Sequence, residues 1–189
     1  MSRLEQALIA VAQFLHRRGV PYMVIGGVAN AVWGIPRATL DVDLTVWVSG
    51  DQIEAFVQAV TAVFPSRTAQ PVAFLHETGV LPLQTSEGVR MDMIFGQLPY
   101  EDAAIQRAAR HIVEGVEVRV CQPEDLVLHK LASERSKDQD DVRGIILQQA
   151  GRLDRRYLDP KVAELAQGLG RPDLCTWYEQ CLAAARRQV

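Results

Sequence analysis

The stretch Leu40-Asp41-Val42-Asp43-Leu44-Thr45-Val46 places two carboxylates inside an otherwise apolar run. Successive side chains of a strand point to opposite faces, so Asp41 and Asp43 share one face and the aliphatic side chains occupy the other. A second run, Val89-Arg90-Met91-Asp92-Met93-Ile94-Phe95, alternates in the same way and separates Asp92 from its apolar neighbours. If the two strands are neighbours, the sheet brings all three carboxylates together.

Such a cluster needs a counter-charge, because like charges at one place repel each other and raise the pKa values of the carboxyl groups. We interpret Asp41, Asp43 and Asp92 as ligands of divalent cations. No histidine or cysteine lies beside them, and an oxygen-only ligand set favours Mg²⁺ or Mn²⁺ over zinc. The alternative for a lone Asp-X-Asp is a pair of exposed residues on an edge strand. Oxygen-bound divalent cations point to phosphate chemistry.

A glycine pair precedes the first acidic run. Residues 20 to 25 predict a short buried strand that ends at Gly26-Gly27, and residues 28 to 33 predict a helix. Glycine between a strand and a helix lets backbone amides approach a phosphate at the helix N-terminus. Taken alone, the pair also fits a simple tight turn.

Together these motifs resemble the nucleotidyltransferase superfamily that includes DNA polymerase beta: Gly26-Gly27, thirteen residues, Asp41-Val42-Asp43, and a later strand with Asp92. Residues 25 to 29 and 36 to 44 most resemble its AbiEii-type branch, whose members often serve in toxin–antitoxin and phage-defence systems. Downstream stretches from Pro123 to Val142 are similar to that branch too, so the resemblance covers roughly residues 20 to 145. The superfamily often has serine where this chain has Gly27.

The resemblance implies a metal-dependent nucleotidyltransferase, an enzyme that moves a nucleoside monophosphate from a nucleoside triphosphate to an acceptor hydroxyl. Asp41 and Asp43 would bridge two ions, Mg²⁺ or Mn²⁺. Asp92 would complete the catalytic metal site, and it is also a candidate general base. The amides of Gly26 and Gly27 would hold the phosphates.

Further charged residues have two interpretations each. Arg37 suits phosphate oxygens, or it pairs with an acidic neighbour. Lys130 reaches the triphosphate according to the resemblance, or it belongs to a solvated helix face. Asp138 and Asp141 are one helical turn apart and face the same way. We expect Asp138 to cap its helix, and Asp141 either to do the same or to act as an accessory residue that orients or deprotonates the acceptor.

The acceptor is the least determined part of the function. The resemblance favours RNA or a protein as acceptor, and a toxin or antitoxin protein as partner. A basic path for RNA would come from the C-terminal arginines at positions 152, 155, 156, 186 and 187. The alternatives are a small-molecule acceptor of the antibiotic type, enclosed by Trp33, Trp47 and Tyr100, or a non-catalytic antitoxin-like binding module.

Composition limits the class of protein. The chain has 189 residues, 48% of them hydrophobic, enough for one packed domain with a small helical appendage. A formal net charge of -3 and a pI of about 5.8 give no global basic field. Three cysteines without metal-ligand spacing are typical of reduced thiols in a cytoplasmic protein. We expect no signal peptide and no membrane span.

The order of elements predicts an α/β fold. A mixed-sheet nucleotidyltransferase core is expected over residues 1–122, and a helical region over 123–189 that packs on it. Residues 72 to 84, 89 to 95 and 113 to 121 read as strands, with Ser86-Glu87-Gly88 as a turn. Helices are expected over residues 3–18, 51–63, 100–110, 123–134, 138–150, 159–168 and 172–187.

Overall fold

The computed structural model describes residues 1–187, and it divides the chain into two compact units. The first unit comprises Met1–Val28 and Ala38–Cys121, and the second comprises Ala29–Arg37 and Gln122–Val189. The short segment from Ala29 to Arg37 therefore leaves the first unit and belongs with the C-terminal helices. Residues 188 and 189, the end of the expected helical region, lie outside the described residues.

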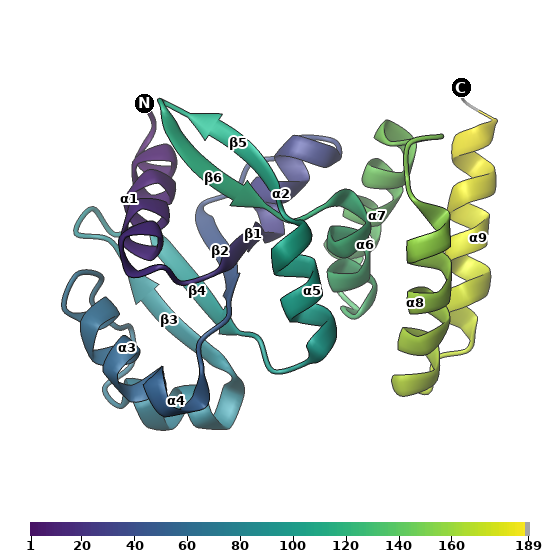
Figure 1. Cartoon of the computed structure of the whole chain (residues 1–189). Coiled ribbons are helices and arrows are strands. Elements are labelled where there is room, and N and C mark those ends of the chain that lie inside the picture. The colour runs from purple at the N-terminus through teal and green to yellow at the C-terminus, as the bar shows by residue number, and fades with distance from the viewer. Residues whose placement is uncertain (188–189) are drawn as a thin grey trace. The chain divides into compact units, whose positions relative to one another are not determined.

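Within the described residues, the first unit contains one six-stranded sheet with the order β3-β4-β2-β1-β6-β5 (Figure 1). The pairs β2–β4 and β1–β6 are parallel, and the other pairs are antiparallel. This mixed sheet confirms the predicted α/β class. The strands are β1 (Tyr22–Ile25), β2 (Asp41–Val46), β3 (Val80–Gln84), β4 (Arg90–Phe95), β5 (Ala109–Val113) and β6 (Val116–Val120).

The N-terminal helix has the bounds that its apolar spacing predicts. Helix α1 (Arg3–Arg18) begins with a reciprocal capping box between Ser2 and Glu5. It ends at Gly19, which adopts a left-handed φ of 63° without strain because glycine has no β-carbon. The other helical elements that begin in this unit are α2 (Gly26–Trp33), the 3₁₀ turn η1 (Gly50–Gln52), α3 (Ile53–Thr61), α4 (Pro71–Thr78) and α5 (Pro99–Arg107).

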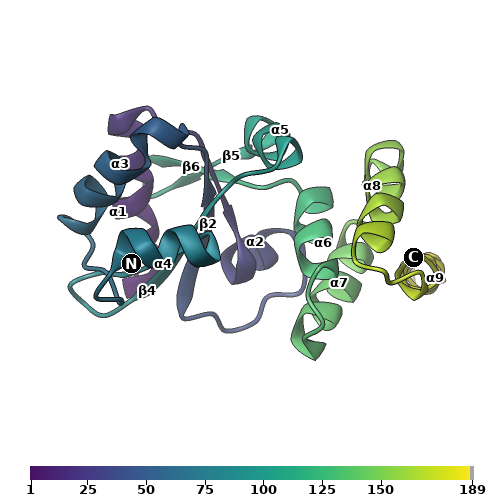
Figure 2. The ribbon, with the colours of Figure 1, turned by 90° about the horizontal axis from the view of Figure 1, so that it is seen from below.

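Aromatic packing decides which face of the sheet is closed. Phe14 of α1 lies 6.1 Å from Phe56 of α3, measured between ring centroids, and Phe56 lies 5.8 Å from Phe95 at the end of β4. Figure 2 shows the ribbons of these two helices beside the sheet. On the same face of β4, Met91 and Met93 are almost fully buried. The alternate residues of β2 and β4 therefore occupy the other face, which helices α1 and α3 do not cover.

Two sequence predictions in this unit are wrong. Residues 72 to 84 are not one strand, because α4 occupies their first half and only β3 is extended. Pro71 at the first helical position and Gly79, with φ 73°, at the end delimit the helix. Residues 109 to 120 form a β5–β6 hairpin rather than a helix end and one strand. Its turn uses Glu114 and Gly115, both with positive φ.

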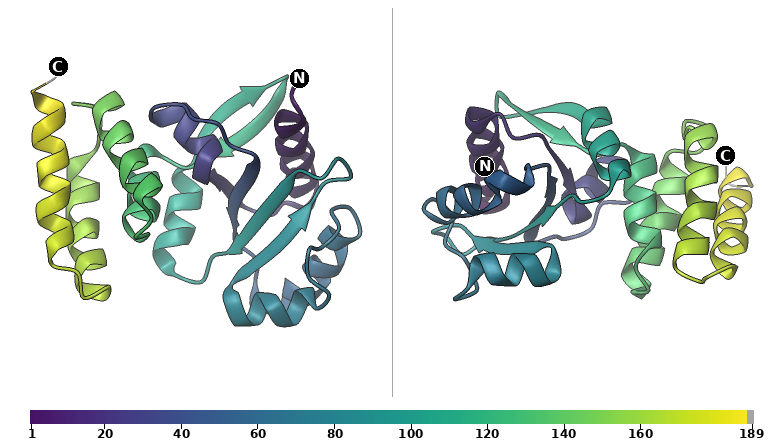
Figure 3. Two further views of the ribbon diagram at one scale, coloured as in Figure 1. Left: turned by 180° about the vertical axis from the view of Figure 1, so that it is seen from behind. Right: turned by 60° about the horizontal axis from the view of Figure 1, so that its bottom comes forward.

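The second unit contains the segment Ala29–Arg37 and, between Pro123 and Arg186, four helices. These are α6 (Pro123–Leu131), α7 (Ser136–Gln148), α8 (Arg155–Gly168) and α9 (Asp173–Arg186). Helices α8 and α9 run side by side (Figure 3). Helix α8 begins a turn earlier than predicted, because the Asp154 side chain accepts hydrogen bonds from the amides of Arg156 and Tyr157. No helix within residues 1–187 is long and apolar enough to cross a membrane.

Candidate active site

The two acidic runs are neighbouring strands in the first unit. Strand β2 pairs with β4 in parallel register, and Asp43 stands directly opposite Asp92. Adjacent strands are about 4.8 Å apart, so these two side chains leave the sheet next to each other. Asp41 precedes Asp43 by two residues on the same face, and all three aspartates are half-buried, whereas Val42 and Leu44 between them are fully buried. The register thus places the three predicted ligand residues on one face of two neighbouring strands.

The carboxylate of Asp43 leaves no room for a side chain at Gly26. The φ of Gly26 is 65°, a conformation that residues with a β-carbon rarely adopt. A β-carbon at this position would overlap with Oδ2 of Asp43 and would lie 2.7 Å from its Cγ. Glycine is therefore required at position 26 both by the backbone conformation and by the Asp43 side chain that packs against it.

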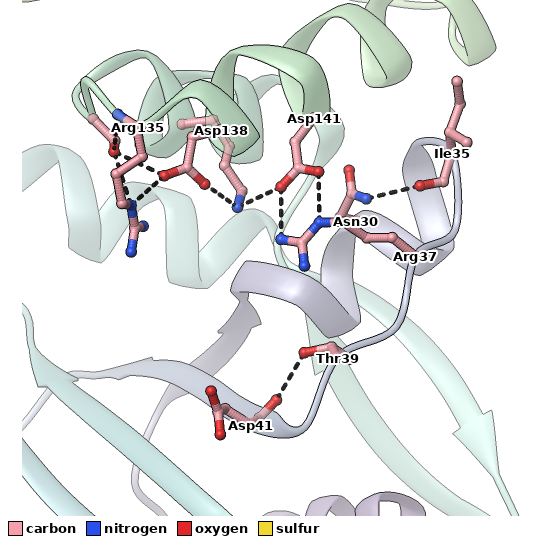
Figure 4. A network of polar contacts seen from close by, with 10 residues as sticks. Asn30, Ile35, Arg37, Thr39, Asp41, Arg135, Asp138 and Asp141 are labelled. Atoms are coloured by element: carbon pink, nitrogen blue, oxygen red, sulfur yellow. Dashed lines mark hydrogen bonds and ion pairs between the residues drawn. The ribbon is translucent and has the colours of Figure 1, made fainter.

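Thr39, which the sequence motifs did not single out, leaves no room for a side chain at Gly27. A β-carbon at Gly27 would overlap with Oγ1 of Thr39 and would lie 2.7 Å from its Cβ. The Thr39 hydroxyl also donates a 3.4 Å hydrogen bond to the backbone carbonyl of Asp41 (Figure 4). A side chain at the second glycine position would displace Thr39, and this explains in structural terms why glycine stands there.

Arg67 was also missed by sequence analysis. Its Nη1 lies 3.1 Å from Oδ1 of Asp92, and the two side chains are 31% and 43% exposed. Within residues 1–187, no three acidic, histidine or cysteine side chains are grouped closely enough to hold a metal ion. The donor chemistry and the register of the aspartates fit a divalent cation. In the structure, however, a guanidinium rather than a closed ligand cage neutralises Asp92.

A second group of charges lies within the helical unit. Lys130 Nζ lies 2.6 Å from Asp138 Oδ1 and 2.8 Å from Asp141 Oδ2 (Figure 4). Ser133 and Arg135 complete the partners of Asp138, donating to its Oδ2 at 2.7 and 2.6 Å. The side chains of Lys130, Asp138 and Asp141 are 8%, 0% and 4% exposed. Lys130 therefore does not belong to a solvated helix face.

Arg37 joins this group as a bidentate partner of Asp141. Its Nε and Nη2 donate to the two carboxylate oxygens at 2.8 and 2.9 Å. Burial opposes ionisation of Asp141, but the hydrogen bonds from Arg37 and Lys130 outweigh it and leave the pKa of the carboxyl below its usual range. The pairing of Arg37 with an acidic neighbour, one of its two predicted interpretations, is present.

Asp138 lies in the first turn of α7, as expected, but the predicted capping role is wrong. Helix α7 has Arg135 as its N-cap residue and no side-chain capping bond. Burial raises the pKa of Asp138, yet the bonds from Lys130, Ser133 and Arg135 lower it more, so the carboxylate stays charged inside the unit. Asp138 and Asp141 face the same way, as their spacing predicts, because both contact the Lys130 ammonium. No local sequence signal pairs these residues with Lys130, since the three come from two helices.

The whole fold is similar to solved nucleotidyltransferase structures. An antigenic nucleotidyltransferase-like protein from Paracoccidioides brasiliensis superimposes with a TM-score of 0.55 at 22% identity, over 93% of this chain and 92% of the other. The lincosamide antibiotic adenylyltransferase LnuA, bound to lincomycin, gives 0.51 at 12% identity, over 77% of this chain and 96% of the other. At these identities the likeness shows the fold.

Sequence comparison gives the family directly. No curated protein has a sequence that matches this chain. Residues 4–167 match the family described as nucleotidyl transferase of unknown function (DUF2204), and this range includes both the aspartate strands and the Lys130 group. The chain therefore belongs to that family and is a transferase enzyme of the nucleotidyltransferase type.

Proposed function

We propose that this protein transfers a nucleoside monophosphate from a nucleoside triphosphate to an acceptor hydroxyl, and that Asp41, Asp43 and Asp92 hold the divalent ions for this reaction. The observation that carries the proposal is the parallel register that sets Asp43 beside Asp92 on the open face of the sheet. Two adjacent carboxylates with a third two residues away suit two Mg²⁺ or Mn²⁺ ions.

In the proposed reaction, the divalent ions and the glycine pair both act on the phosphates of the substrate. When bound, the divalent ions supply Lewis acidity that neutralises the phosphates and lowers the pKa of the acceptor hydroxyl. Gly26 and Gly27 leave the first amides of α2 without side chains in front of them, which suits an approaching phosphate. Triphosphate contacts by Arg37 and Lys130 remain predictions from the sequence resemblance.

Asp92 is the better candidate for the general base. The predicted accessory residue Asp141 accepts charged hydrogen bonds on both oxygens and has a lowered pKa, so it is a poor proton acceptor. We assign Asp141 instead the positioning of Arg37 and Lys130. Asp92 is 43% exposed and has one solvent-accessible ion pair, so its carboxylate is reachable by an acceptor.

For the acceptor we propose RNA or a protein, in a toxin–antitoxin-like role. This choice, and a toxin or antitoxin protein as partner, depends on the resemblance to the AbiEii-type branch. The predicted basic path is weaker than its sequence suggests, because Arg155 pairs with Asp159 and Glu179 of its own unit. The second candidate is a small-molecule acceptor, which the similarity in fold to an antibiotic adenylyltransferase favours.

Nucleotide binding is the first test. Calorimetric titration with each of the four nucleoside triphosphates, with and without Mg²⁺, should show binding that the metal strengthens for at least one of them. Addition of a chelator should return the affinity to the metal-free value. Equal affinity in all conditions would contradict metal-dependent transfer and would favour a non-catalytic binding module.

The acceptor is identified by the destination of the label. The protein is incubated with α-labelled triphosphates, Mg²⁺ and a cell extract, and the products are separated into RNA, protein and small-molecule fractions. Label in RNA or protein supports the proposed acceptor. Label confined to small molecules would overturn it in favour of an antibiotic-type enzyme. A parallel reaction with the Asp43→Asn variant shows whether the label depends on the aspartate strands.

A further inference from the structure

Arg67 is held beside the aspartates by its backbone. Its amide donates to the carbonyl of Pro82 at 2.9 Å, and the preceding residue Ser66 forms a β-bridge with Leu83. The amide of Gln84 donates to the carbonyl of Pro65 at 3.0 Å. The segment before α4 therefore runs along the edge strand β3 and cannot carry Arg67 away without breaking these bonds.

This anchoring directs the guanidinium to Asp92. Pro82 of β3 is the register partner of Asp92 on β4, so the residue that fixes the Arg67 backbone lies directly beside the aspartate. The resulting ion pair of 3.1 Å places a permanent positive charge at the carboxylate that the proposed function assigns to a divalent ion. A guanidinium and a metal ion cannot both lie against the same carboxylate oxygen without strong repulsion.

We propose that Arg67 is an internal counter-cation that competes with the divalent ion for Asp92. The inference rests on the proposed function, because it assumes that the three aspartates bind metal. Arg67 neutralises Asp92 while the site holds no ion, and it must release Oδ1 when an ion binds to that oxygen. Free metal consequently binds weakly, and the site fills mainly when the triphosphate brings further negative charge to it. Arg67 thus sets the metal affinity of the site without being a ligand.

The sheet register and the ion pair together give the direction of the expected effect. Asp43 stands directly opposite Asp92, and Arg67 contacts Asp92 from the neighbouring edge segment. An ion bound between the two carboxylates would lie close to the guanidinium and would be repelled by it. Removal of the guanidinium should therefore raise the affinity for a bare ion.

The test measures binding of Mn²⁺ alone, without nucleotide, from the electron paramagnetic resonance signal of the free ion. The variant Arg67→Gln keeps a polar side chain of similar length but removes the charge. Arg67→Lys retains the charge without the planar fork. Arg110→Gln is the matched control, because Arg110 lies on β5, at the opposite edge of the same sheet, in an exposed ion pair with Glu117 of β6. Asp92→Asn reports whether the ion uses this carboxylate.

We expect Arg67→Gln to bind Mn²⁺ roughly three- to tenfold more tightly than the wild type, from loss of a partly exposed ion pair and of repulsion toward the ion. Arg67→Lys should lie between the two, and Arg110→Gln should match the wild type. The gain should disappear when Asp92→Asn is combined with Arg67→Gln. Adding a nucleoside triphosphate should reduce the difference between Arg67→Gln and the wild type.

The outcomes separate the inference from the function on which it rests. Unchanged or weaker Mn²⁺ binding in Arg67→Gln, together with a loss of binding in Asp92→Asn, would overturn the role of Arg67 and leave the metal site intact. Mn²⁺ binding that is absent in the wild type and in every variant, even with a triphosphate present, would overturn both. A circular dichroism melt of each variant confirms that all of them are folded when they are compared.

Discussion

The two charged clusters of this protein use the same residue types in opposite ways. In the helical unit, Asp138 and Asp141 are 0% and 4% exposed, and Lys130, Arg37 and Arg135 neutralise them at 2.6 to 2.8 Å. In the sheet unit, Asp92 is 43% exposed and has a longer ion pair of 3.1 Å with Arg67. A carboxylate closed off by internal cations is suited to hold the fold, whereas an open one is suited to receive a ligand.

This difference makes burial, rather than charge, the criterion that separates the two roles. Removing one charged side chain from a closed cluster leaves its partner buried without a counter-ion and destabilises the fold. Removing a carboxylate from an open cluster costs little stability, because water replaces what is lost, and it even relieves repulsion. A variant of the closed cluster that loses activity but no stability, or a variant of the open cluster that loses stability but no activity, would contradict this assignment.

The largest effect is expected on transfer in the sheet unit. Asp43→Asn should lower the transfer rate on the order of a thousandfold, because it removes a proposed metal ligand where phosphate charge develops. The free energy of unfolding should stay within about 1 kcal/mol of the wild type. Label transfer and urea denaturation measure the two quantities. Asp51→Asn, at an exposed position of η1, is the control, and persistence of transfer in Asp43→Asn would show that the aspartate is structural.

The next largest effect is expected on stability in the helical unit. Lys130→Met should lower the free energy of unfolding by about 3–5 kcal/mol, because the buried carboxylates of Asp138 and Asp141 lose a shared counter-ion. The neighbouring Lys137→Met removes an exposed lysine from α7 and should change stability by less than about 0.5 kcal/mol. Denaturation curves of the two variants are compared directly. Equal stability would mean that the buried cluster contributes no more than a surface charge.

Gly26→Ala is expected to have a smaller but separable effect. The left-handed backbone alone makes alanine unfavourable by about 1–2 kcal/mol, and the overlap with Asp43 adds about 1–3 kcal/mol. Gly19→Ala is a matched control, because Gly19 has nearly the same φ and nothing within 4 Å of an added β-carbon. Differential scanning fluorimetry should place Gly26→Ala below Gly19→Ala. Metal-enhanced nucleotide binding should weaken only in Gly26→Ala.

Strand periodicity was enough to predict which face each aspartate occupies. The alternation around Asp43 and Asp92 depends on local geometry that every strand shares, and the burial of Val42 and Met91 confirms it. The pairing of the two strands was suggested by resemblance rather than by any local signal. The error at residues 72 to 84 was avoidable, because Pro71 and Gly79 mark the ends of a helix in sequence.

The residues that sequence analysis missed all depend on tertiary structure. Arg67 and Thr39 lie in connecting segments, and only the path of those segments brings them to Asp92 and Gly27. The contacts of Lys130 with Asp138 and Asp141 join two helices, so the helical spacing that relates the two aspartates does not reveal their shared partner. Local patterns predict faces and periods, but they carry no information on which segments meet.

The smallest effect is expected on the acid dependence of stability. The pKa values of Asp138 and Asp141 are lowered in the folded protein, where hydrogen bonds from Lys130, and from Arg37 or Arg135, outweigh burial. A carboxyl group with a lowered folded pKa stabilises the protein above its unfolded pKa of about 3.9 and loses this contribution as the pH falls toward its folded pKa. The contribution of these two carboxylates to the free energy of unfolding should therefore be constant between neutral pH and about pH 5. It should decrease below about pH 4.

The comparison that isolates this effect uses two aspartates of the same helix. Asp138→Asn should be less stable than the wild type at pH 7, and its stability should decline less steeply below pH 4, because an amide has no proton to gain. Asp140→Asn, whose side chain is 75% exposed in an ion pair with Arg143, should follow the wild-type curve. Urea unfolding from pH 3 to pH 7 gives both slopes. An unchanged slope in Asp138→Asn would mean that the acid dependence arises from other carboxylates, and that the closed cluster is less strongly coupled to the fold than its burial implies.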